Sequence, residues 1–311
     1  MRASLRSNQE STDFVKRPWL WITHPFASER RSSKHFRELD RIYLGGKGID
    51  SPARPVALAH SLSQGFFVTL QNANQVVQFN EKGEKLGPLR AEDGAPRAFC
   101  RPQGIGIGSD DRVWISELGS HCIKILDTTT NKIETLDDLA VNRTHVHDPV
   151  GMHGARDGSM LIADTGNNRV LSVQSTGAVK VICDRVGYGL GEFRHPYSFC
   201  AGNSDETFWV VDRRNHRLQE MDFSGNPCRE IGIAGFGIGC LLLPEFAAIF
   251  EDGTLVIDEW SCTKAVKMFS PEGEELDSLR LDYAPRGMLV HDGLLFVCEW
   301  SGDHVYVYER I

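Results

Sequence analysis

Six side chains, each directly after a proline, are the first candidates for chemistry in this sequence. They are Val56, Gln103, Val150, Tyr197, Glu245 and Arg286. Glu245 can act as a general acid or base, Tyr197 as a hydrogen-bond donor or proton shuttle, and Arg286 as a clamp for an anion. These residue types predict acid/base chemistry, provided that the chain brings them together.

The prolines before these residues recur at nearly equal intervals. Pro55, Pro102, Pro149, Pro196, Pro244 and Pro285 are separated by 47, 47, 47, 48 and 41 residues. After each proline come a short apolar strand, a polar turn, a second apolar strand, an acidic loop, a third strand, a turn and a fourth strand. Four short strands in a unit of about 45 residues are typical of a propeller blade, which must stack against neighbours to bury both its faces.

The sixth unit ends after its third strand, Val305–Tyr308. Its missing fourth strand is expected at Arg41–Gly46, which reads like Arg229–Ala234, the fourth strand of its own unit. We therefore predict an all-β, six-bladed β-propeller over residues 38–311, closed by the N-terminal strand. Residues 1–37 are predicted to be a tail, partly disordered or packed on the ring.

Alternation along the innermost strands predicts what faces the axis. The residue after each proline should point inward, and so should the residue two positions further on. The second set is Leu58, Ile105, Met152, Phe199, Ala247 and Met288. A mixed polar mouth above an apolar plug is typical of a small-molecule pocket. The alternative is that Glu245 and Arg286 only pair with each other across adjacent blades.

Loops after the second strands of the blades should form a second ring on the same face. Arg213 lies in one of these loops and is a further candidate clamp for an anion. The predicted catalytic residues are thus Glu245, Tyr197, Arg286 and Arg213. The predicted substrate-binding residues are Gln103, Met152, Phe199, Trp260, Trp300, Glu259 and His195.

Two segments carry a resemblance to a known family. Asp164-Thr-Gly-Asn-Asn-Arg169 and Asp212-Arg-Arg-Asn-His-Arg217 each lie between two apolar strands. They resemble the NHL repeat, whose core reads Asp-x-x-Asn-x-Arg in that place. The run Gly187–Phe193 is similar to the glycine-rich segment that leads into the next blade of that family. The resemblance extends over residues 38–311 and is strongest in blades three and four.

The resemblance also points to peptidylglycine amidating lyases, which share this fold. It implies a catalytic arginine where Arg213 stands, and zinc-binding histidines directly after the blade prolines. None of the six residues in those places is histidine, so we predict neither that zinc site nor any cofactor. His145-Val-His147-Asp148 has a spacing compatible with a metal. Its alternative reading is a chance group of polar residues in a short loop.

Composition limits the partners and the location. The net charge is −8 and the pI about 5.8, which argues against binding to nucleic acid. Eight scattered cysteines without a CxxC pair, and no apolar run of membrane-spanning length, predict a cytoplasmic protein. We therefore expect a small, partly apolar or aromatic ligand at the channel mouth. The favoured function is a non-redox lyase, isomerase, cyclase-type or hydrolytic enzyme, and the alternative is a protein-interaction scaffold using the same face.

Overall fold

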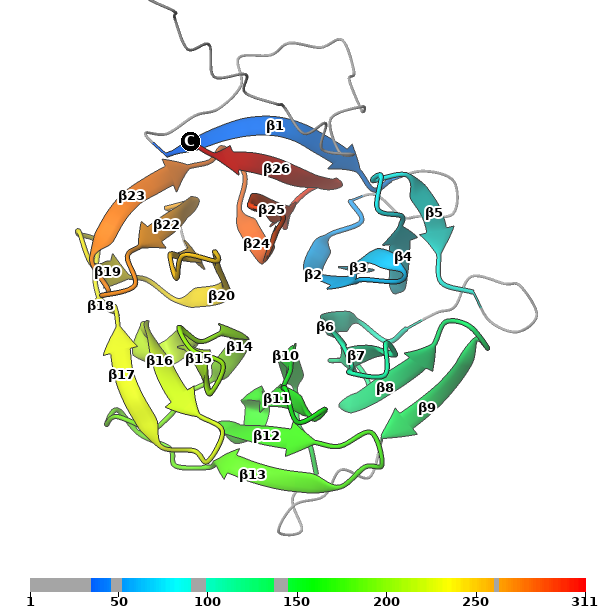
Figure 1. Cartoon of the computed structure of the whole chain (residues 1–311), viewed down its shortest axis with the longest axis horizontal. Helices are drawn as coiled ribbons and strands as arrows, with labels where there is room; N and C mark the ends of the chain where they lie inside the picture. Colours follow the sequence, from blue (N-terminus) through cyan, green and yellow to red (C-terminus); the bar gives the residue numbers. More distant parts are fainter. Residues whose placement is uncertain (1–34, 46–51, 91–98, 137–144, 260–262) are drawn as a thin grey trace, which may run out of the picture.

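The computed structural model describes residues 35–45, 52–90, 99–136, 145–259 and 263–311. Six four-stranded antiparallel sheets surround a central axis (Figure 1). The innermost strands each begin at one of the six recurring prolines: β2 (Pro55–Ser61), β6 (Pro102–Ile107), β10 (Pro149–Gly154), β14 (Pro196–Ala201), β20 (Pro244–Ile249) and β24 (Pro285–His291). The predicted six-bladed propeller is confirmed.

The other strands follow in order from the axis outward. The second strands are β3 (Gly65–Leu70), β7 (Val113–Glu117), β11 (Met160–Asp164), β15 (Thr207–Asp212), β21 (Leu255–Glu259) and β25 (Leu294–Glu299). The third strands are β4 (Gln75–Phe79), β8 (Cys122–Asp127), β12 (Arg169–Val173), β16 (Arg217–Asp222), β22 (Ala265–Phe269) and β26 (His304–Arg310). The outer strands of blades one to five are β5 (Lys85–Pro88), β9 (Lys132–Leu136), β13 (Val179–Cys183), β17 (Pro227–Ile231) and β23 (Glu275–Arg280).

Blade six contains strands from both ends of the sequence. Its outer strand is β1 (Phe36–Tyr43), which pairs antiparallel with β26 and lies outside it in Figure 1. In this register Arg41 lies opposite Tyr306. The side chain of Phe36 is fully buried in the core. Of the predicted tail, residues 1–34 lie outside the described part of the chain.

Most of the core lies between blades, because each sheet is covered on both faces by its neighbours. The second strands are therefore continuous apolar runs: β3, β7, β11 and β21 are buried along their whole length. Trp114 on β7 and Trp209 on β15 are the largest fully buried side chains. Helical structure in the described residues is limited to the short 3₁₀ turns η2 (Thr165–Asn167) and η3 (Arg213–Asn215), and a small parallel pair, β18 (Ile233–Ala234) with β19 (Cys240–Leu241), lies in the loop before β20.

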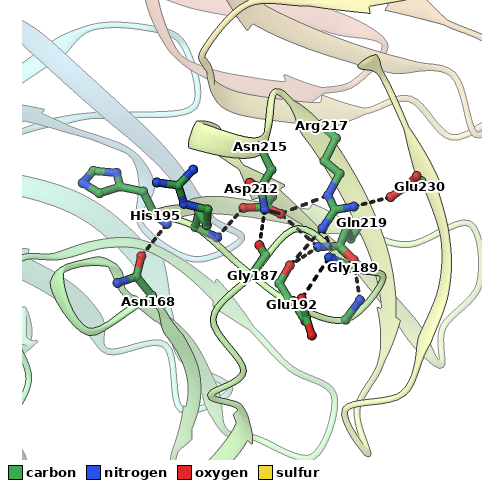
Figure 2. A network of polar contacts seen from close by, with 12 residues as sticks. Asn168, Gly187, Gly189, Glu192, His195, Asp212, Asn215, Arg217, Gln219 and Glu230 are labelled. Carbon is green, nitrogen blue, oxygen red and sulfur yellow. Dashed lines mark hydrogen bonds and ion pairs between the residues drawn. The ribbon is translucent and has the colours of Figure 1, made fainter. Parts of the chain in front are cut away.

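The Asp-x-x-Asn-x-Arg motif of blade four forms the polar network of Figure 2. Asp212 is fully buried, and its Oδ2 accepts hydrogen bonds from the side chains of Asn215, Arg217 and Gln219. Arg217 also donates to the backbone carbonyls of Gly189 and Glu192. The motif therefore ties the glycine-rich loop before β14 to the rest of its blade, which is a structural role.

A hydrogen bond between an acidic side chain and a loop N–H recurs in blades two to five. An acidic residue at the end of the second strand accepts a hydrogen bond from the backbone N–H two residues before the blade proline. The pairs are Glu117 with Cys100, Asp164 with His147, Asp212 with Arg194, and Glu259 with Leu242, at 3.0, 2.8, 2.8 and 2.9 Å. These carboxylates satisfy loop N–H groups that would otherwise be buried without a partner.

A second repeated contact joins each blade to the next. The residue before the blade proline has a positive φ in blades one to five, and in blades two to five its N–H donates to a side chain of the preceding blade. These donor–acceptor pairs are Arg101 with Asn74, Asp148 with His121, His195 with Asn168, and Leu243 with His216. The acceptor residues are asparagine or histidine and have a positive φ themselves. These two residue types suit the acceptor position because they tolerate a left-handed backbone and offer a side-chain acceptor atom. In blade one the N–H of Arg54 donates instead to the backbone carbonyl of Gly302.

The described residues contain no helix with the length and apolarity that crossing a membrane requires. Seven cysteines, Cys100, Cys122, Cys183, Cys200, Cys228, Cys240 and Cys298, are free thiols. Cys262 lies outside the described residues.

Candidate functional site

The polar residues after four of the blade prolines meet at the axis. We call Gln103, Tyr197, Glu245 and Arg286 the mouth layer. The hydroxyl of Tyr197 accepts hydrogen bonds from Arg286 Nη2 at 2.5 Å and from Gln103 Nε2 at 3.2 Å. These contacts join blades two, four and six across the channel. Since the hydroxyl oxygen accepts two hydrogen bonds, its proton is the part of the group that can be donated, and the Glu245 carboxyl lies within hydrogen-bonding reach of it.

Glu245 lies between two guanidinium groups. Arg213 Nε donates to its Oε1 at 2.9 Å, and Arg286 Nε lies 3.5 Å from its Oε2. Both arginines also face the ring of Tyr197, at 5.5 and 6.0 Å from its centroid. The predicted catalytic residues are thus brought into one cluster. Arg213 reaches it from η3, and the other three side chains come from innermost strands.

Asp258, near the end of β21, is a member of this cluster that the sequence analysis missed. Its side chain is fully buried, and its Oδ1 accepts the backbone N–H groups of Glu245 and Phe246 at 2.9 and 2.6 Å. It lies one residue before Glu259, on the opposite face of its strand. The alternation that selected the inward residues of the innermost strands could have selected it as well.

Burial dominates the protonation states of the cluster. It raises the pKa of Glu245 above its usual value, while Arg286 and Arg213 oppose the shift. It also raises the pKa of Tyr197 well above its usual value, so the phenol is neutral at pH 7. Burial, followed by the charge of Glu245, raises the pKa of Asp258 from 3.8 to about 8. Asp258 therefore holds a proton at neutral pH. Its neighbour Glu245 lies between two arginines, whose charges favour the ionised form of its carboxyl group.

This proton predicts a pH dependence of stability. Between pH 3.8 and about 8 the folded protein keeps Asp258 protonated while the unfolded chain does not. The folded state then binds more protons, so this group's stabilising contribution is complete below pH 3.8 and is lost as the pH rises through about 8. Asp258→Asn is neutral at every pH, and its free energy of unfolding should fall less over this range than that of the wild type. Urea unfolding at several pH values measures both slopes, and parallel slopes would contradict the assignment.

Aromatic residues flank the mouth layer. Trp300 stacks on the guanidinium group of Arg286, 3.8 Å from its ring centroid, as a wall residue should. His195 stacks with Tyr197 at 6.1 Å between ring centroids. Burial, with the charges of Arg214 and Arg213, lowers the pKa of His195 to about 4, so this imidazole is neutral at pH 7. Trp260, another predicted substrate-binding residue, lies outside the described residues.

The sequence predicted a polar mouth that opens to a small-molecule pocket, but the four side chains of the mouth layer are almost completely buried. Gln103, Tyr197, Glu245 and Arg286 are only 0, 6, 2 and 5% exposed. The mouth layer is buried because long side chains from several blades meet across a narrow channel. The layer immediately below is not a solid plug. All six residues predicted there, including Met152 and Phe199, line a cavity of about 50 Å³, which has room for water but not for a substrate.

Glu259 is placed differently from its predicted role in substrate binding. Its side chain is 1% exposed and its Oε1 holds the backbone N–H of Leu242, in the repeated contact described above. Glu259 therefore supports the loop that enters blade five.

Two histidines do gather on the mouth face, but not the predicted pair. His121, rather than His145, lies beside His147 and Asp148, with the two imidazole rings stacked at 4.6 Å. The Nδ1 atom of His121 accepts the N–H of Asp148 as part of the repeated contact between blades. That scaffold role accounts for the position of His121 without a metal.

Comparisons with known proteins agree with this architecture. The family model described as NHL repeat matches residues 99–126, in blade two, outside the motifs of blades three and four. A probable peptidyl-alpha-hydroxyglycine alpha-amidating lyase of Caenorhabditis elegans is 27% identical over 128 residues, covering 39% of this chain and 37% of the relative. The human NHL repeat-containing protein 3 is 24% identical over 182 residues, covering 50% of this chain and 51% of the relative. The chain thus spans about half or less of these relatives.

Solved structures match over most of the chain at low identity. Virginiamycin B lyase from Staphylococcus aureus superposes with a TM-score of 0.63 at 15% identity, covering 89% of this chain and all of that one. A gluconolactonase from Xanthomonas campestris gives 0.68 at 14%, covering 90% and 91%. A chain of a nidogen/laminin complex gives 0.62 at 13%, covering 84% and 96%. The fold is that of a six-bladed β-propeller, and residues 99–126 carry an NHL repeat.

Proposed function

We propose that the protein is an enzyme that binds a small, partly apolar or aromatic molecule at the channel mouth and transforms it without a redox cofactor. The observation that carries this proposal is the cluster at the axis. It combines two buried carboxyl groups with raised pKa values, Glu245 and Asp258, and a neutral phenol with two guanidinium groups. Perturbed acids beside fixed cations are more common at functional sites than elsewhere.

Each member of the cluster has a chemical role to fill. Glu245 Oε2 and Asp258 Oδ2 are buried and make no hydrogen bond to the described residues. Glu245 Oε2 lies 3.5 Å from Arg286 Nε and can accept a proton, whereas Asp258 Oδ2 is the oxygen that would carry the proton of Asp258, because Oδ1 accepts two backbone N–H groups. Glu245 would be the general base, Tyr197 the proton donor, and Arg213 with Arg286 the groups that stabilise negative charge as it develops. This set suits lyase, isomerase, cyclase-type or hydrolytic reactions.

The similar proteins support a non-redox reaction. Two of the structures that share the fold are named as a lyase and a gluconolactonase, and one partial relative is named as an amidating lyase. Fold similarity alone does not assign a reaction, so the residues at the mouth carry the argument.

The alternative function is a protein-interaction scaffold using the same face. It is favoured by the low exposure of the mouth layer, whose four side chains present little surface to a small ligand. The structure of a nidogen/laminin complex shows that a propeller of this fold can take part in a protein complex. Binding to nucleic acid is not proposed because the net charge is −8.

Three probes drawn from the similar proteins test the enzyme proposal. They are gluconolactone, a peptidyl-alpha-hydroxyglycine, and quinupristin, the compound present in a structure of catalytically inactive virginiamycin B lyase. We expect the purified protein to convert at least one of them faster than the spontaneous rate, followed by mass spectrometry or, for the lactone, by acid release. Failure with all three, together with no change in melting temperature on adding any of them, would favour the scaffold.

A further inference from the structure

A second group of potential ligands lies on the face opposite the mouth. His60, near the end of β2, packs against His291, the last residue of β24, with ring centroids 3.8 Å apart and the ring planes tilted by 36°. Glu81, in the turn between β4 and β5, has its Oε1 2.8 Å from His60 Nε2. One ligand atom from each of the three residues can be chosen so that all lie within 4.8 Å of one another. The group joins blade one to blade six.

We propose that His60, Glu81 and His291 form a binding site for a divalent transition-metal ion, best matched by Zn²⁺. Two imidazoles and one carboxylate are a ligand set that zinc accepts, with a fourth position left for water or another ligand. Tetrahedral ligands at zinc distances are about 3.3 Å apart, so the ligand atoms need to approach one another by up to about 1.5 Å. The sequence analysis predicted no metal, because these residues come from distant parts of the chain.

Two of the three ligands lie in tight turns. His291 begins a two-residue hairpin in which Asp292 and Gly293 have φ values of 49 and 69°, a turn that fixes the strand ends tightly. Glu81 lies in a turn whose N–H groups at 82 and 84 bond to the Asn80 side chain. A site on such elements is already organised for binding.

The surroundings of the two imidazoles also suit a metal. Their side chains are only 10 and 19% exposed, and both pack against the ring of Phe66, at 4.5 Å for His60 and 5.2 Å for His291. The carboxylate of Asp292 lies 3.6 Å from His291 Nε2 and adds negative charge. The Glu81 side chain is exposed, so an ion can reach the site from solvent.

A bound metal would cross-link the N-terminal part of the chain to its C-terminal part. β2 and β24 are neighbouring innermost strands that contact each other side by side. A ligand that binds only the folded state stabilises it by mass action, so zinc should raise the melting temperature.

Zinc binding to the untagged, full-length, chelator-treated protein tests the proposal. Calorimetric titration should give one equivalent per chain, and Co²⁺ should give the intense visible bands of a four-coordinate site. Glu81→Gln changes an exposed turn residue, so the melting temperature of its metal-free form should match that of the wild type. Its affinity for zinc should fall by about 10- to 100-fold. His60→Gln and His291→Gln should weaken binding at least as much.

His147→Gln is the matched control, since it changes a histidine of the group on the opposite face. It should keep the full equivalent of zinc and the full rise in melting temperature. Absence of zinc binding by the wild type, unchanged affinity in Glu81→Gln, or loss of the metal in His147→Gln would each overturn the proposal.

Discussion

Replacing Glu245 by glutamine is expected to lower turnover by about 10²- to 10⁴-fold while leaving ligand binding largely intact. Glutamine keeps the shape of the side chain and can still accept from Arg213, but it no longer takes up a proton. The test uses whichever of the three probes the wild type converts. Initial rates, ligand affinity and melting temperature are measured on the same preparation.

The competing reading is that Glu245 only neutralises Arg286 and Arg213. Glu245→Gln should then lower the free energy of unfolding by about 1–3 kcal/mol, with activity following the folded fraction. Glu220→Gln is the matched control, because Glu220 is also buried and ion-paired, to Arg229 at 2.7 Å, but lies outside the mouth cluster. It should lose stability and keep its turnover. Equal turnover in Glu245→Gln and wild type, at equal folded fraction, would end the catalytic assignment.

Removing residues 1–46 is expected to give an aggregated protein. The deletion takes away β1, so the backbone groups of β26 that pair with β1 lose their partners, while the pairing with β25 remains. It also removes the fully buried side chains of Phe36 and Leu44 from the core. An exposed strand edge of this kind pairs readily with other chains. Size-exclusion chromatography with light scattering distinguishes monomer from aggregate.

Deleting residues 1–30 provides the control, because β1 and its pairing are retained. Its melting temperature should stay close to that of the full chain. A monomeric protein of residues 47–311 that melts like the wild type would show that the ring does not depend on the N-terminal strand.

The sequence by itself determined the blades and the inward side chains. A proline at each repeat marks the first residue of an innermost strand, and the period of two then selects what faces the axis. This reasoning is local and repeats six times, so it brought Gln103, Tyr197, Glu245 and Arg286 together correctly. It also placed Met152 and Phe199 in the layer below.

Only the tertiary structure decided what depends on contacts between blades. The addition of Asp258 to the mouth cluster, and the nearly complete burial of that cluster, follow from how far side chains reach across the channel. The role of Glu259 depends on a loop N–H that periodicity does not describe. His60, Glu81 and His291 meet because turns of blades one and six lie side by side, although His60 and His291 are separated by most of the sequence. Strand patterns report how one blade is built, whereas pKa values and ligand groups arise where different blades touch.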